Sequence, residues 1–268
     1  VFSAGITKLR FDTSIATFLP KSDASYKYYD RAKEIYGDVD TFVILSVSHK
    51  DLWQYETFEN INNLLIDLEA YQEFNASLES RRINQLNEVL ADGAGQGDVL
   101  FSAFSEDAAF HRLLERKLSV LGWEGGPISS RMAGKLKSAV TAATDLKSLE
   151  MIDEIISPFT IHDISGENDM LEEVQLIETD NSGRRILPQT PADFKTFISQ
   201  LKRNPVFEKG IYATDAQGNI SDLGFIIRFQ DISDSDPIAR EILEIVQSHD
   251  ELNIIAQGEP IVYIWMNN

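Results

Sequence analysis

The last quarter of the chain constrains the fold most, because its motifs follow one another in a fixed order. Thr190 and Asp193 form a capping-box-like pair around Pro191, which is typical of a helix start. The segment DAQGN at 215–219 separates two apolar, β-branched segments, as a hairpin turn does. The pattern predicts a helix from residue 190, strands at 210–214 and 220–229, a helix at 236–248 and a strand at 253–256.

The second strand of this hairpin alternates between apolar and mixed positions. Leu223, Phe225, Ile227 and Phe229 occupy every second position, so one face of the strand is expected to be buried. The chain then finishes on the apolar segment PIVYIWMNN, for which we consider two explanations: it packs into a core, or it approaches a membrane.

The first part of the chain predicts a β-α-β unit. Helical spacing over residues 23–36 precedes TFVILSV at 41–47, which we predict to be a strand buried on both faces. A helix follows over 52–71 with an apolar stripe, and residues 74–78 are expected to form a short second strand. Such a unit is right-handed when its strands are parallel.

Residues 81–189 are expected to be a mainly helical insertion. The predicted elements are a helix at 106–121, helical structure over 130–155, and short strands at 159–164 and 174–178 around an acidic loop at 167–173. The chain therefore divides into a first half at 1–80, the insertion, and a second half at 190–268. We predict an α+β fold.

Composition excludes several classes of partner and chemistry. The net charge of -19 argues against nucleic acid and against docking on anionic lipid headgroups, since both need basic patches. The chain has no cysteine, which excludes disulfides, thiolate catalysis and cysteine-ligated metals.

No motif predicts a catalytic, metal or cofactor site. Asp231, Asp234 and Asp236 resemble a calcium loop, but the central glycine and distal glutamate of an EF-hand are missing. Solvated carboxylates at a helix start, where they favour the helix dipole, are therefore the preferred explanation. The histidines lack HExxH spacing, and the glycines at 93–97 lack a preceding strand. We expect that the chain is not an enzyme. The alternative is an enzyme with a noncontiguous acidic metal site that includes these three aspartates.

Aromatic residues gather around the first strand. They are Tyr26, Tyr28, Tyr29, Tyr36, Trp53, Tyr55 and Phe58. Core packing explains most of them, and an apolar cleft for a hydrophobic ligand is the alternative.

Two separate segments, about 9–80 and 190–262, resemble the first large extracytoplasmic loop of resistance-nodulation-division (RND) exporters, closest to the MMPL-like lipid exporters. The resemblance comes from the order of short motifs. They are LRFDTS at 9–14, FLP at 18–20, YGD at 36–38, the strand at 41–47, Asn204-Pro205, YATD at 212–215 with Gly218, and Gly258-Glu259-Pro260.

The resemblance implies a periplasmic porter domain of ferredoxin-like β-α-β subdomains, split by the insertion, in a membrane exporter. Partners would be the transmembrane part and the second porter loop of the same polypeptide, other copies in a homo-oligomer, and a hydrophobic small molecule or lipid. Proton-relay carboxylates of such exporters lie in the membrane helices, so this part would bind, gate and shape a path.

The bulky residues beside the predicted strands are the candidates for this path: Tyr29, Trp53, Phe58 and Phe225. An alternative function is a stand-alone soluble periplasmic binding protein or lipid chaperone, which would have no adjoining membrane segment.

Overall fold

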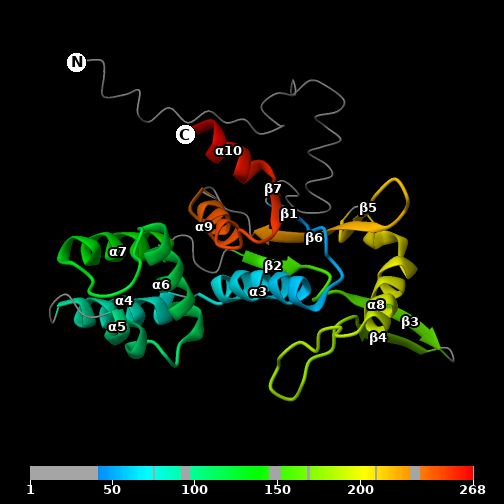
Figure 1. Ribbon diagram of the computed structural model, residues 1–268, viewed down its shortest axis with the longest axis horizontal. Coiled ribbons are helices and arrows are strands. Elements are labelled where there is room, and N and C mark those ends of the chain that lie inside the picture. Colours follow the sequence, from blue (N-terminus) through cyan, green and yellow to red (C-terminus); the bar gives the residue numbers. More distant parts are fainter. Residues whose placement is uncertain are drawn as a thin grey trace.

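The computed structural model describes residues 42–74, 76–91, 97–144, 152–167, 170–208, 210–229 and 236–267. Within them the chain is α+β, with helices around an antiparallel five-stranded sheet (Figure 1). Expectations for residues 1–41, including the helix at 23–36, lie outside the described residues.

The sheet has the strand order β2-β6-β1-β7. Its members are β1 (Phe42–Ser48), β2 (Ile152–Ile156), β6 (Ile220–Phe229) and β7 (Asn253–Gln257). All three pairings along this path are antiparallel. A fifth strand, β5 (Tyr212–Thr214), pairs with the beginning of β6 through the predicted hairpin.

The strand β1 is confirmed, but its burial on both faces is wrong. Val43, Leu45 and Val47 are fully buried, whereas the alternate residues Phe42 and Ile44 are only partly buried. The reason is the antiparallel sheet, which allows one face to be covered more completely than the other. An apolar run therefore does not by itself require two covered faces.

Two helices, α3 and α9, belong with the five-stranded sheet. α3 (Tyr55–Gln72) buries Phe58, Ile61, Leu65 and Leu68, as its apolar stripe predicts. α9 (Asp236–Gln247) follows β6 and packs against α3. We call the five-stranded sheet with α3 and α9 the sheet unit.

The second strand expected at 74–78 is wrong, because a helix begins at residue 76. α4 (Ala76–Ala91) is the first of four helices that lie beside the sheet unit in Figure 1, and the expected boundary at residue 80 falls inside it. α5 (Gly97–Ala103), α6 (Ala108–Val120) and α7 (Ser130–Ala143) follow. We call α4–α7 the helical unit.

The helix expected over 130–155 ends at Ala143, and residues 152–156 form β2 instead. Periodicity cannot separate a short apolar strand from a buried helical turn, and IDEII gains its strand identity from pairing with β6. The helix expected at 106–121 is confirmed as α6, where the Asp107 side chain accepts a hydrogen bond from the Phe110 N–H.

Beyond β2 the chain forms a separate two-stranded sheet of β3 (His162–Glu167) and β4 (Met170–Gln175). The expected acidic loop at 167–173 is therefore largely strand. Residues 176–190, which we call the strap, then lead to α8 (Pro191–Arg203) and the short 3-10 helix η2 (Pro205–Phe207).

The last quarter follows the prediction closely. The Thr190 hydroxyl accepts from the Asp193 N–H, and Asp193 accepts from the Thr190 N–H, so the capping box is present. Leu223, Phe225, Ile227 and Phe229 are buried along β6. After β7, the chain turns at Gly258, whose φ is 127°, into α10 (Glu259–Asn267).

Candidate functional site

Three of the four predicted path residues meet in one aromatic cluster. The ring centroids of Trp53 and Phe58 are 6.2 Å apart, and Phe58 lies 4.7 Å from Phe159, which in turn lies 6.4 Å from Phe225. The fourth predicted residue, Tyr29, lies outside the described residues.

Helix α8 supplies the remaining rings. Phe194 lies 5.4 Å from Phe58 and 6.2 Å from Trp53, and Phe197 lies 5.4 Å and 6.4 Å from the same two rings. Most of these contacts are tilted or edge-on, as aromatic quadrupoles favour. The aromatic cluster is thus Trp53, Phe58, Phe159, Phe194, Phe197 and Phe225.

The predicted residues differ in their access to solvent. Phe58 and Phe225 are fully buried, whereas Trp53 is only partly buried. The inner rings are therefore closed to a ligand in this conformation, and Trp53 is where the aromatic cluster reaches the surface. A path role for all three residues remains a prediction that requires the cluster to open.

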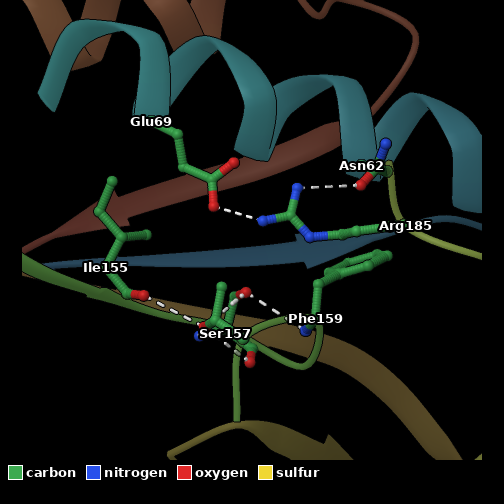
Figure 2. Close-up of polar contacts among 7 residues, drawn as sticks. Asn62, Glu69, Ile155, Ser157, Phe159 and Arg185 are labelled. Carbon is green, nitrogen blue, oxygen red and sulfur yellow. Dashed lines mark hydrogen bonds and ion pairs between the residues drawn. The ribbon is translucent and has the colours of Figure 1, made fainter. Parts of the chain in front are cut away.

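A short turn fixes the inner ring of Phe159, as Figure 2 shows. The Ser157 N–H donates to the Thr160 hydroxyl at 2.8 Å, and that hydroxyl donates to the Ile155 carbonyl at 3.1 Å. The Phe159 N–H donates to the Ser157 hydroxyl at 3.2 Å. These groups satisfy one another where β2 ends, and the turn places the Phe159 ring against Phe58.

The strap crosses the same region and is fastened to α3 by Arg185. Its guanidinium donates to Glu69 and lies 3.4 Å from the Asn62 Oδ1 atom (Figure 2). The strap's own turn is organised by Asp180, which accepts from the Ser182 hydroxyl and from the Ser182 and Arg184 N–H groups. These bonds lower the pKa of Asp180 to about 2.

A surface hollow lies at the exposed edge of Trp53. Its lining combines the β1–α3 loop with the β5–β6 hairpin, and consists of His49, Lys50, Asp51, Leu52, Trp53, Gln54, Asp215, Ile220 and Ser221. The Asp215 pKa is lowered because its carboxylate accepts hydrogen bonds, first from the Asn219 N–H. An aromatic edge beside such polar groups suits a molecule with both apolar and polar parts.

A buried ion cluster in the helical unit is structural in character. Arg82 donates hydrogen bonds to Glu79 and to Asp107, and its Nε atom lies 2.6 Å from Asp107 Oδ2. The same guanidinium lies over the rings of Phe74 and Phe110. Burial raises the pKa of Glu79 even though Arg82 opposes this. These contacts join α4 to the start of α6, although Glu79 Oε2 is buried without a hydrogen-bond partner among the described residues, and we assign no binding role to the cluster.

The described part of the chain contains no group of three His, Asp or Glu side chains arranged to hold a metal ion. Of the three predicted aspartates, Asp231 and Asp234 lie outside that part, and Asp236 is the first residue of α9. The acidic metal site therefore remains an untested hypothesis.

Among the described helices, none is long and apolar enough to cross a membrane. The last one, α10, buries Ile261 and Ile264 while exposing Val262 and Trp265.

Comparison of this chain with models of protein families, with curated proteins and with solved structures finds no match.

The sequence pattern identifies Trp53, Phe58 and Phe225 but not the three rings packed with them, Phe159, Phe194 and Phe197. Phe194 and Phe197 are recognisable as the apolar face of a helix. Nothing local indicates that this face packs on Trp53, more than a hundred residues earlier in the sequence. Phe159 was expected in a strand and lies in a turn instead.

Proposed function

We propose that this chain is an extracytoplasmic porter domain of an RND-type membrane exporter, with a ferredoxin-like sheet unit. It would form part of the pathway for a hydrophobic or amphiphilic molecule. The observation that carries the proposal is the aromatic cluster, which extends from a polar surface hollow at Trp53 into the core.

The connectivity of the sheet unit supports the ferredoxin-like assignment. Along the chain its elements run β1, α3, β2, β6, α9 and β7, and the sheet order is β2-β6-β1-β7 with antiparallel neighbours. This is the β-α-β-β-α-β arrangement in which each helix connects two strands that are separated by a third. The helical unit interrupts the first connection, and β3, β4 and α8 interrupt the hairpin between β2 and β6.

The chemistry of the aromatic cluster supports an amphiphilic substrate. Its six rings offer dispersion and edge-on contacts without a charge, which suits an alkyl chain or a flat hydrophobe. The hollow beside Trp53 offers hydroxyl, amide, carboxylate and ammonium groups for a polar head. A molecule placed across Trp53 would match both environments once α8 moves away from Phe58.

The surface of α10 supports a position near a membrane. Trp265 is 62% exposed and Val262 is 44% exposed, on a helix whose sequence EPIVYIWMN contains a single charged residue. Tryptophan is enriched at the headgroup level of bilayers, where an amphipathic ring is favoured.

The proposal is tested in the complete polypeptide by restraining α8. The Lys202 ammonium donates to the Gly218 carbonyl at 2.6 Å, so α8 and the β5–β6 turn are adjacent. A short bismaleimide joining Lys202→Cys to Gln217→Cys should abolish export of a fluorescent amphiphile from vesicles. The control pair, Lys195→Cys with Ser199→Cys, lies within α8 and should leave export unchanged when cross-linked.

Unchanged export in the restrained variant would contradict the proposed pathway. A complete polypeptide without apolar segments of about 20 residues beside this region would contradict the exporter class itself. Retained amphiphile binding in that case would favour the stand-alone binding protein or lipid chaperone.

A further inference from the structure

Charged side chains from three helices meet where the helical unit contacts the sheet unit. Lys117 of α6 places its Nζ atom 2.5 Å from Glu241 Oε1 and 2.5 Å from Glu244 Oε2, both on α9. Arg116 Nη2 lies 3.7 Å from the second oxygen of Glu241. The side chains of Lys117 and Glu241 are only 4% and 6% exposed, so this network lies inside the contact.

A second group of charges extends the same contact. Arg112 of α6 lies 3.0 Å from Asp67 Oδ1 on α3, and His249 Nε2 lies 3.1 Å from the other Asp67 oxygen. His249 also faces Glu251, at 3.4 Å. We call these residues, together with Arg116, Lys117, Glu241 and Glu244, the charged joint.

The charged joint also contains polar atoms without a hydrogen-bond partner among the described residues. They are Asp67 Oδ1, Arg112 Nε, Arg116 Nε and Glu241 Oε2, and the adjacent Tyr71 hydroxyl also lacks one. The Arg112–Asp67 and Arg116–Glu241 contacts are ion pairs without hydrogen-bond geometry. Burial raises the pKa of Tyr71 and, against the opposing effect of Lys117, the pKa of Glu241. The joint is therefore not an optimised interior, since a fully satisfied core would leave no such atoms.

Charged side chains at a contact change the free energy of both the separated state and the joined state. Each ion loses hydration when the units join and regains it when they separate, so a charged contact separates at lower cost than an apolar one of equal area. The helical unit is inserted in the chain between α3 and β2, it packs against α3 and α9, and its described helices contribute no strand to the five-stranded sheet. Separation would therefore leave the sheet pairings intact.

We propose that the charged joint is a separable contact that lets the helical unit move away from the sheet unit as a whole. Ion pairs between its positive and negative side chains stabilise the joined state. Removing one charge should therefore shift the equilibrium between joined and separated units towards the separated state. The inference concerns movement between the two units and holds whether or not the chain belongs to an exporter.

The chain offers a direct test because it contains no native cysteine. Spin labels are attached at Asn63→Cys on α3 and Lys135→Cys on α7, both exposed positions in the two units. Double electron–electron resonance spectroscopy should give a single short distance between the two labels in the parent chain. Lys117→Met leaves two carboxylates facing each other and should move at least half of the population to a longer distance.

Two variants act as controls. Lys117→Met combined with Glu241→Leu restores the charge balance with apolar side chains and should return the short distance. Arg131→Met removes the same charge from an exposed position of α7 and should behave as the parent chain.

Hydrogen exchange identifies the outcome that overturns the inference. Faster exchange confined to α4–α7 and the contacting faces of α3 and α9 is expected for Lys117→Met. A single short distance in this variant, or equal loss of protection in β1 and β6, would instead show that the two units form one inseparable structure.

Discussion

Two glycines should respond in opposite ways to replacement by alanine, because only one of them lies against another backbone segment. A Cβ atom on Gly224 would lie 2.2 Å from the Gly210 carbonyl oxygen, whereas one on Gly134 in α7 would meet open space. Gly224→Ala should therefore lower the free energy of unfolding by about 3 kcal/mol, because the added methyl group clashes with the backbone at Gly210. Gly134→Ala should raise it by about 0.5–1 kcal/mol because alanine favours the helix. Urea denaturation measures both, and equal unfolding midpoints of the two variants would contradict the close approach of Gly224 to the Gly210 carbonyl.

The lowered pKa of Asp180 predicts that the turn of the strap loses hydrogen bonds at acid pH. Its usual pKa of 3.8 is lowered to about 2, first by the Ser182 hydroxyl and then by the Arg184 and Ser182 N–H groups. A carboxyl with a lowered pKa stabilises the fold above the usual value, and this contribution is lost as the pH falls towards 2. The amide resonances of Ser182 and Arg184 should titrate with a midpoint near 2. A midpoint near 3.8, or the same titration in Asp180→Asn, would show that these bonds are absent.

At the scale of elements, α8 depends on the two rings that it places over Phe58. Phe197→Ala removes a fully enclosed ring and should destabilise the chain by about 3–5 kcal/mol. Ile198→Ala, the neighbouring and only partly buried position, should cost about 1 kcal/mol. Thermal unfolding of both variants checks this difference, and similar losses would contradict the packing of α8 on the aromatic cluster.

Elements with local signals could be predicted from the sequence, and elements without them could not. Thr190 and Asp193 act within one helical turn, and the 215–219 turn sets its own hairpin, so the last quarter was predicted correctly. By contrast, β2 becomes a strand through pairing with β6, some 70 residues later in the sequence. Its short apolar run has no period that separates strand from helix.

The candidate site shows the same division between local and long-range information. Bulk and position beside a strand identified Trp53, Phe58 and Phe225. The contacts that make them one cluster involve Phe159 and α8, and sequence patterns do not encode which apolar faces meet. The charged joint was likewise missed, because Lys117 and Glu241 are separated by 124 residues.

At the scale of the whole molecule, the three tryptophans lie in three different parts. Trp53 belongs to the aromatic cluster, Trp123 packs on Phe101 in the helical unit, and Trp265 is exposed on α10. Replacing two of them by phenylalanine in turn gives three chains with one fluorescent reporter each. These chains separate binding at the aromatic cluster from adsorption elsewhere on the surface.

The most direct test of the account is quenching of each reporter by an amphiphile with a brominated alkyl chain. We expect saturable quenching of Trp53 fluorescence below the critical micelle concentration, with little change in the fluorescence of Trp123. At Trp265, surface contact should give only weak quenching that does not saturate. Quenching of Trp53 no greater than that of Trp123 would contradict an amphiphile site at the aromatic cluster.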